Sequence, residues 1–211
     1  MPITRLHQAL CLILVLLSPA LQAGFDEAAA AFAAGDYNKA LSEVRPLAEQ
    51  GDARCQYSMG VLYENGFGVV KDTQQAAAWY LKAAHQGNTD AQYNLGAMNE
   101  HGTGIPVDYA EAARWYRPAA EAGDIDALSN LGVLYEKGQG VPQDRVLAMA
   151  LYNVSVAYAQ TSNTQAARNR QGLANRMPLD DLKKALALTE TLLKPNNLKP
   201  GLEAYLAEHK Q

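Results

Sequence analysis

The chain has almost no cysteine, and this limits how its fold can be stabilised. Its two cysteines are Cys11 and Cys55, and Cys11 lies in an N-terminal segment with the features of an export signal. If that segment is removed, only Cys55 remains, and no internal disulfide is possible. The mature fold must then depend on packing and hydrogen bonding.

Long apolar runs and basic clusters are also missing. Beyond residue 23 no stretch approaches the roughly 20 apolar residues that span a bilayer. The 22 acidic residues outnumber the 18 lysines and arginines, which form no block. A mildly acidic chain of this kind is a poor candidate for binding nucleic acid or an anionic membrane.

The local motifs of common enzymes and metal sites are absent as well. There is no G-x-S-x-G, H-E-x-x-H or C-x-x-C, and no serine precedes a lysine at S-x-x-K spacing. His85, His101 and His209 are far apart in the sequence, so we expect surface roles for them. We therefore predict no catalytic residues, no metal site, no cofactor and no enzymatic activity.

Residues 1–23 have the pattern of a secretory signal peptide. Arg5 precedes an apolar run over residues 9–17, and Ser18-Pro19 follows before the small Ala23. Cleavage after Ala23 would change the formal charge from −4 to −5. The pattern predicts a periplasmic or secreted protein without stable membrane insertion. The alternative is that the segment is retained and tethers the chain to the inner membrane.

The chain does contain an internal repeat of 36 residues. SMGVLYENGFGVVKD (58–72) aligns without a gap with NLGAMNEHGTGIPVD (94–108) and NLGVLYEKGQGVPQD (130–144). The recurring positions are Gly60, Gly96 and Gly132; Gly66, Gly102 and Gly138; Gly68, Gly104 and Gly140; Asp72, Asp108 and Asp144; Ala76, Ala112 and Ala148; and Tyr80, Tyr116 and Tyr152.

Each unit is predicted to be a helix A, a short loop and an antiparallel helix B. Gly132 follows an apolar helical pattern and is small enough to let a neighbouring helix approach, whereas Gly138 suits a left-handed C-cap. Asp144 is placed to cap helix B, and in the other copies Gln75 and Glu111 complete a capping box. Because the glycine pair recurs three times and follows a helix, it is a structural turn rather than a phosphate loop.

This pattern resembles the Sel1-like repeat family, a relative of the tetratricopeptide repeats. Repeat 3 carries the family positions as Ala127, Leu131, Gly132, Tyr135, Gly138, Gly140, Val141, Asp144, Ala148 and Tyr152. Repeats 1 and 2 add Trp79-Tyr80 and Trp115-Tyr116. The resemblance implies an all-α fold, an α/α solenoid or superhelix of about five helix pairs.

The expected organisation follows from the repeat and its weaker extension at both ends. It comprises a signal peptide (1–23), an N-terminal capping helix pair (24–51), three Sel1-like repeats (52–87, 88–123 and 124–160), a degenerate C-terminal capping helix pair (161–194) and a tail (195–211). Pro46 and Pro118 fall inside B helices, which we expect to be bent or broken there.

The resemblance also implies a function. Members of the family hold protein partners on their surface, and in tetratricopeptide-like solenoids the A helices line the concave side. The outward positions of these helices give the candidate partner-binding residues Arg54, Tyr57, Glu64, Asp90, Tyr93, Asn94, Glu100, His101, Asp126, Asn130, Glu136 and Lys137. Val61, Asn65, Ala97, Ser129 and Val133 share this outward register.

Some of these residues carry more specific expectations. Glu64, Glu100 and Glu136 repeat every 36 residues and are expected to form a solvated stripe. Asn94 and Asn130 occupy a position where related repeats use an amide to hold an extended peptide. Cys55 replaces alanines of the other repeats, so it is expected to be a small buried core residue.

We therefore predict a non-enzymatic scaffold or adaptor for a protein or peptide partner. The alternative is a cell-wall or β-lactam-binding protein or enzyme, as in a cysteine-rich branch of the family. The shortage of cysteine and the missing S-x-x-K motif speak against that alternative.

Overall fold

The computed structural model describes residues 19–159 and 164–209, so most of the expected signal peptide lies outside the described part. Within these ranges the regular structure is helical and there is no strand. The helices are α2 (Pro19–Ala33), α3 (Tyr37–Glu49), α4 (Ala53–Asn65), α5 (Thr73–His85), α6 (Thr89–His101), α7 (Tyr109–Glu121), α8 (Ile125–Lys137), α9 (Arg145–Ala159), α10 (Gln165–Ala174), α11 (Leu179–Leu192) and α12 (Leu198–Glu208).

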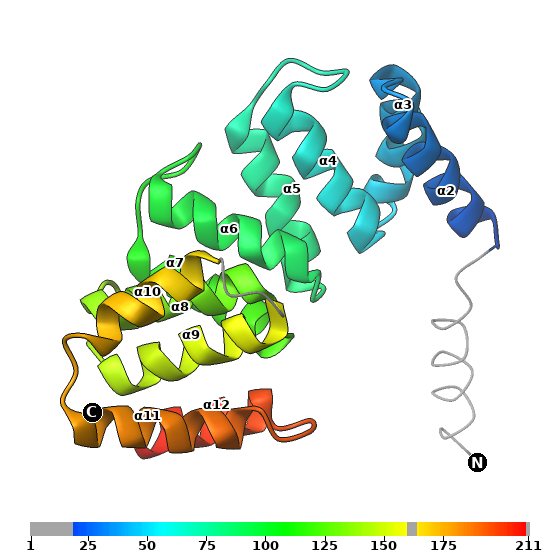
Figure 1. The fold of residues 1–211 in the computed structure, drawn as a ribbon. Helices are drawn as coiled ribbons and strands as arrows, with labels where there is room; N and C mark the ends of the chain where they lie inside the picture. Colours follow the sequence, from blue (N-terminus) through cyan, green and yellow to red (C-terminus); the bar gives the residue numbers. More distant parts are fainter. Residues whose placement is uncertain (1–18, 160–163, 210–211) are drawn as a thin grey trace, which may run out of the picture.

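The predicted α/α solenoid is confirmed. From α2 to α10 each helix packs against the next in a curved array, and α11 and α12 continue it at the C-terminal end (Figure 1). The most extensive contacts are within the pairs α4/α5, α6/α7 and α8/α9. The A helix α8 also contacts the A helices α6 and α10 on either side of it, so these three helices lie on the inner side of the curve.

The predicted helix caps are confirmed. Backbone N–H groups at the start of α5, α7 and α9 donate to the side chains of Asp72, Asp108 and Asp144. The helices α4, α6 and α8 end in a left-handed glycine, with φ of 75°, 72° and 68° at Gly66, Gly102 and Gly138. The turn thus has a structural role in each copy.

The expected capping box does not form. Its second bond would need the backbone N–H of the capping aspartate, but that group is already used. The N–H of Asp72 donates to Tyr63 O, and the N–H of Asp108 to Asn99 O, both at 2.9 Å. The loop is therefore fastened to the end of helix A, and Glu111 instead pairs with Arg114.

Close approach of the two helices depends on the glycine inside helix A. A Cβ added at Gly96 would lie 2.5 Å from the ring of Tyr116, which comes from helix B of the same unit. Gly60 and Gly132 meet the equivalent tyrosines in the same way. Tyr80, Tyr116 and Tyr152 are consequently completely buried.

The helices with an internal proline are not broken. Pro46 lies within α3 and Pro118 within α7, and both helices have 13 residues, the same length as α5. Each proline removes the hydrogen bond to the carbonyl four residues earlier, in Ser42 or Arg114. Both of those residues are exposed, so water can bond to the released carbonyl groups.

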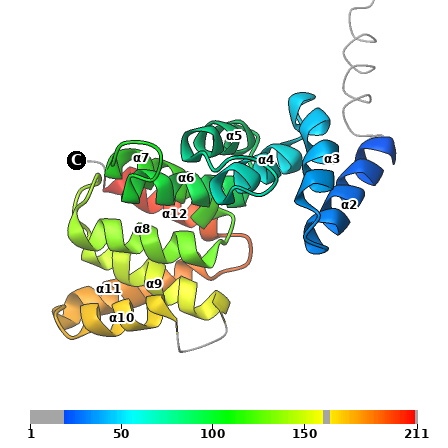
Figure 2. The ribbon, with the colours of Figure 1, turned by 90° about the horizontal axis from the view of Figure 1, so that it is seen from above.

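The two ends of the array depart from the repeat. At the N-terminal end, α2 begins at Pro19 and continues through the expected cleavage point after Ala23. At the C-terminal end, the expected capping pair has a different arrangement, because α10 and α11 both pack on α9. Seen from above in Figure 2, α10 and α11 lie next to α9 at one end of the molecule.

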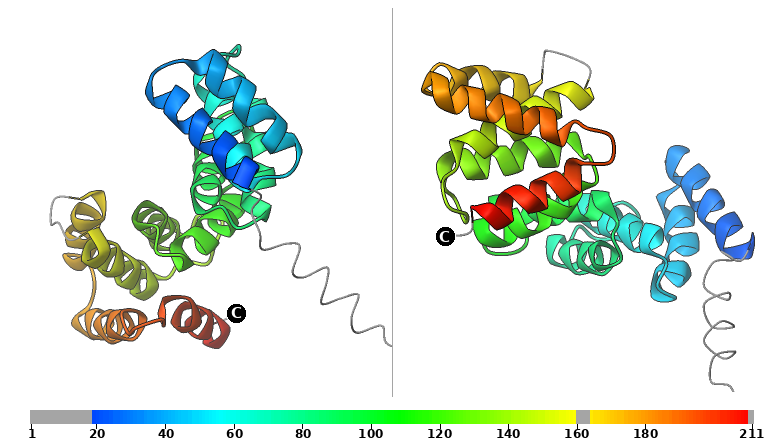
Figure 3. Two further views of the ribbon diagram at one scale, coloured as in Figure 1. Left: turned by 90° about the vertical axis from the view of Figure 1, so that its right-hand side faces the viewer. Right: turned by 90° about the horizontal axis from the view of Figure 1, so that it is seen from below.

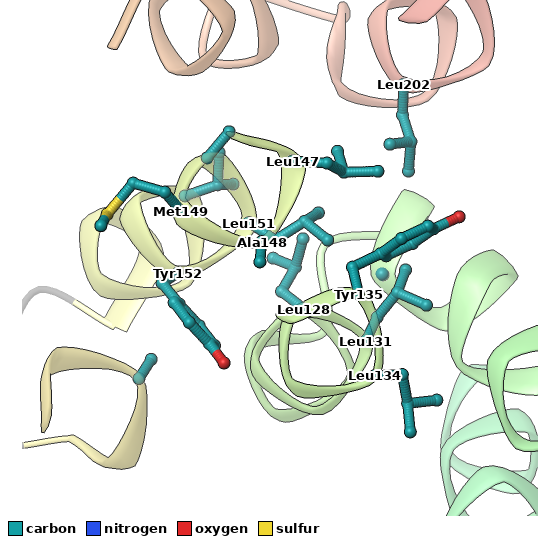
Figure 4. Close-up of a cluster of buried hydrophobic side chains, with 14 of the residues drawn as sticks. Leu128, Leu131, Leu134, Tyr135, Leu147, Ala148, Met149, Leu151, Tyr152 and Leu202 are labelled. Atoms are coloured by element: carbon teal, nitrogen blue, oxygen red, sulfur yellow. The ribbon is translucent and has the colours of Figure 1, made fainter. Parts of the chain in front are cut away.

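The C-terminal tail docks as a further helix. From below, α12 lies beside α11 (Figure 3), and it also contacts α7. Leu202 is completely buried and points toward Leu147 and Tyr135 (Figure 4). The hydroxyl of Tyr205 donates to Asp144 Oδ2 at 2.8 Å. The tail therefore covers helices of the third repeat.

The glycine in helix A provides the first prediction. The substitution Gly96→Ala should lower the free energy of unfolding by about 1–3 kcal/mol, because the new methyl group overlaps the Tyr116 ring. Chemical denaturation measures this change. Gly172→Ala in α10 is the matched control, since no atom lies within 4 Å of its added Cβ. It should stabilise the protein by up to about 1 kcal/mol, and equal effects of the two variants would contradict the packing account.

Candidate functional site

The predicted partner-binding residues differ in their exposure. Asp90, His101, Asp126 and Lys137 are exposed. The remaining predicted residues are partly buried: Arg54, Tyr57, Glu64, Tyr93, Asn94, Glu100, Asn130 and Glu136. Several of the partly buried ones are bonded within the protein, so the inner face is more ordered than a simple row of exposed side chains.

The prediction that Glu64, Glu100 and Glu136 form a solvated stripe is wrong. Each glutamate accepts a hydrogen bond from the hydroxyl of a completely buried helix B tyrosine. The bonds run from Tyr80 to Glu64 at 2.6 Å, from Tyr116 to Glu100 at 2.8 Å and from Tyr152 to Glu136 at 2.8 Å. A buried hydroxyl needs such a partner, so the repeated carboxylate has a structural role.

The repeated asparagines link consecutive units. Asn130 in α8 donates through Nδ2 to the hydroxyl of Tyr116 in α7 at 3.2 Å. Asn94 in α6 also lies near the hydroxyl of Tyr80 of the preceding unit and lowers its pKa slightly. The Asn130 bond therefore supports the packing of neighbouring repeats, and the role of both amides in holding a peptide stays a prediction.

The network has an electrostatic consequence. Burial raises the pKa of Tyr80, Tyr116 and Tyr152, and the adjacent glutamate raises it further, because a phenolate there would lose water and face a carboxylate. The three hydroxyls consequently stay protonated and remain hydrogen-bond donors.

Two further tyrosines, on the A helices, lie beside the buried tyrosines of helix B. Tyr57 of α4 contacts Tyr80, with ring centroids 5.7 Å apart, and Tyr93 of α6 contacts Tyr116 at 5.9 Å. The third repeat has Ser129 at this position. Ser129 was expected to face outward but is buried, and its hydroxyl has no hydrogen-bond partner among the described residues.

An apolar pocket of about 310 Å³ opens between α2, α3 and α4. Its walls include Phe25 and Phe32 of α2 and Tyr57 and Val61 of α4. Val44 of α3 forms part of the lining, and it stands 36 residues before Tyr80. The pocket therefore lies where the first unit has valine in place of the repeated helix B tyrosine.

A second groove, of about 380 Å³, opens between α8 and α10 with Tyr152 of α9 in its lining. It is polar, and it lies in the unit that has Ser129 in place of the repeated helix A tyrosine. The side chains around it are Asn130, Val133, Glu136, Lys137, Gln165, Arg168, Asn169 and Arg176, with Gly172.

The grooves bring together some predicted residues and others that the sequence did not reveal. Asn130, Glu136 and Lys137 meet in the α8/α10 groove, and Tyr57 lines the apolar pocket. Phe25 and Arg168 were missed because they lie in units without the repeat motif. For the apolar pocket, the usable signal was the interruption of the helix B tyrosine pattern at Val44.

The described residues contain no obvious reactive centre. No group of three or more potential ligands could hold a metal ion there. Cys55 is buried as expected, and desolvation raises the pKa of its thiol to about 12, so the thiolate nucleophile is scarce. None of the described helices is long and apolar enough to cross a membrane.

Comparison with known proteins identifies the repeat. The family model described as Sel1 repeat matches residues 53–88, 89–124 and 125–155. The chain belongs to the Sel1 repeat family. Sel1 repeats typically act as scaffolds for protein interactions and are generally not catalytic. No curated protein sequence matches the chain.

Two solved Sel1-type structures are similar to this chain. A Sel1 repeat protein from Oxalobacter formigenes has 35% identity over 62% of this chain, with a TM-score of 0.60. The protein c5321, a protective antigen of uropathogenic Escherichia coli strains with an SLR fold, has 31% identity over 82% of this chain, with a TM-score of 0.67. The chain spans only 54% and 36% of their respective lengths.

The buried tyrosines of this Sel1 repeat protein predict alkaline destabilisation. Their folded-state pKa is raised, so their stabilising contribution is complete below the unfolded pKa of about 10 and is lost as the pH rises above it. Three such groups should lower the free energy of unfolding by about 4 kcal/mol per pH unit in that range.

Urea titrations at a series of alkaline pH values measure this slope. In Tyr116→Phe the slope should be smaller by about 1.4 kcal/mol per pH unit, since one ionisable group has gone. A slope unchanged by this substitution would show that Tyr116 ionises without unfolding.

Proposed function

We propose that this protein is a non-enzymatic scaffold that binds a protein partner through the inner face of its A helices. The observation that carries the proposal is the pair of open grooves at the two ends of this face. Between them, Tyr93 packs beside the Tyr116 ring. A partner lying along the face would meet an open recess at either end.

Of the two recesses, the apolar pocket should contribute more to the affinity for a partner. Phe25, Phe32, Tyr57 and Val61 form apolar walls, and Val44 leaves space that a tyrosine ring occupies in the other units. Burying a partner's aromatic or large aliphatic side chain there would remove apolar surface from water on both molecules. Anchors of this type commonly dominate the free energy of protein binding.

We further propose that the protein is exported and works in the periplasm or outside the cell. The support is the signal-peptide pattern of residues 1–23. No observation in the described residues favours the alternative of a β-lactam or cell-wall enzyme. The grooves hold no arrangement of nucleophile and base, so the protein is proposed to bind and not to catalyse.

The apolar pocket gives a direct test of the scaffold function. A photo-crosslinking amino acid at position 61, in the pocket wall, should capture a discrete protein partner in cells, whereas position 70 in an exposed loop should not. Val44→Tyr should abolish the capture from position 61, because the new ring fills the pocket while Gly24 retains the glycine of the tyrosine-bearing units.

The stability of Val44→Tyr has to be measured beside the crosslinking, since a misfolded variant would lose capture for a trivial reason. Ala29→Glu is a second variant, which places a carboxylate at an exposed position of the pocket lining, leaves position 61 free for the crosslinking amino acid and adds no volume to the core. The pocket is not the partner site if both variants fold and still give the same crosslinked product.

Export has its own test. N-terminal sequencing of the mature protein should begin at Gly24, and the protein should be recovered in the periplasmic or secreted fraction. Recovery of the intact N-terminus in the membrane fraction would favour a retained anchor instead.

A further inference from the structure

Helix α11, at the end of the repeat array, exposes a row of leucines. Leu179, Leu186 and Leu193 are spaced seven residues apart, about two helical turns, so they lie along one side of the helix. Leu193 directly follows α11 and keeps right-handed helical backbone angles. The exposed fractions of the three residues are 68%, 56% and 40%. Single exposed leucines are ordinary on a protein surface, whereas a row of them forms a patch that suits a binding partner.

The position of α11 makes this row unusual. Terminal repeats normally carry a polar outer face, because no further unit covers them. Figure 2 shows α11 at the end of the molecule away from α2. The helix packs on α9 and α12 through another side, where Thr189 accepts a hydrogen bond from Asn153 of α9 and Leu192 lies close to Gly201 of α12. The leucine row is thus left uncovered by the described helices.

The charged side chains beside the row complement a copy of themselves. Lys183 stands three residues before Leu186 and Glu190 four residues after it, so both neighbour Leu186 on the helix surface. When two α11 helices lie antiparallel with their Leu186 side chains together, Lys183 of each copy falls opposite Glu190 of the other. Leu179 of each copy then falls opposite Leu193 of the other. The row and its charges are therefore self-complementary about one two-fold axis.

The charges favour the antiparallel arrangement over a parallel one. In a parallel pairing the two Lys183 side chains would lie beside each other, and so would the two Glu190 side chains. Lys183 also pairs with Asp180 of its own helix, with Nζ 3.2 Å from Oδ1, but the two side chains are 67% and 84% exposed. Such a surface pair contributes little to stability, so Lys183 can turn to a carboxylate of a second copy.

We propose that α11 is a self-association surface, on which α11 of a second copy of this chain packs antiparallel through the leucine row. One helix face is small compared with the roughly 800 Å² per partner of a standard interface, so the dimer is weak and forms only at high concentration. The apolar pocket lies at the other end of the array and stays open. The inference goes beyond the proposed function and does not depend on it.

Analytical ultracentrifugation of the protein recovered from cells, at a series of concentrations, tests the proposal. The average mass should rise from that of the monomer towards twice that value. Leu186→Glu should weaken the association by at least about tenfold, because it brings two carboxylates together at the axis. The matched control is Leu81→Glu on α5, where the leucine is 41% exposed, and it should leave the association unchanged. Thermal unfolding verifies that both variants fold.

Charge reversal tests the pairing without changing Leu186. Lys183→Glu and Glu190→Lys should each weaken the association when measured alone, since like charges would then face each other between the copies. An equimolar mixture of the two variants should associate as the unmodified protein does, because every charge again meets an opposite one. In a parallel pairing each single variant would associate like the unmodified protein, and that result would overturn the proposal.

Photo-crosslinking from position 186 in cells identifies the occupant of the surface. It should yield a product that contains two copies of this chain. Capture of a different protein in its place would overturn the proposal, as would a monomer at every concentration up to about 1 mM. A dimer that Leu186→Glu leaves intact would use another surface and would overturn it too. Crosslinking from position 61 is unaffected by any of these outcomes, so the proposed function is tested separately.

Discussion

The structure depends on one repeated contact, a tyrosine of helix B packed against a glycine of helix A. The contact is so close at Gly96 that a single added carbon atom would overlap the Tyr116 ring. The ring is completely buried, and its hydroxyl reaches Glu100 on the same helix A. Apolar packing and a buried hydrogen bond therefore act at the same place, and together they set the distance and the rotation of the two helices.

The same contact propagates along the solenoid. Asn130 of the following unit donates to the Tyr116 hydroxyl, so one hydroxyl joins a glutamate of its own unit to an asparagine of the next. Tyr57 and Tyr93 pack beside the rings of Tyr80 and Tyr116. In the first unit Val44 takes the place of the helix B tyrosine, and the apolar pocket opens beside it. Variation in a packing motif thus creates a recess available for binding.

The C-terminal helix covers part of the apolar surface that the end of a repeat array would otherwise expose. Helix α12 buries Leu198 and Leu202 against the last units, and Tyr205 bonds to Asp144, the aspartate that also caps α9. Lys199 lies 3.5 Å from Glu121 of α7, which adds an ion pair across 78 residues of sequence. These contacts leave the inner face of α8 and α10 open, so the end of the array is closed without covering the second groove.

The sequence by itself determined the repeat unit and the solenoid. Helix starts, helix ends and the turn glycines depend on residues close together in the chain, so Asp108 and Gly102 could be interpreted locally. The tertiary structure decided the roles of Glu100, Asn130 and Ser129 and the docking of α12. Their partners lie on other helices, such as Tyr116 at 16 residues from Glu100 and Asp144 at 61 from Tyr205. A periodic pattern shows that a side chain recurs on one face of a helix, but only packing shows whether water or another helix meets it.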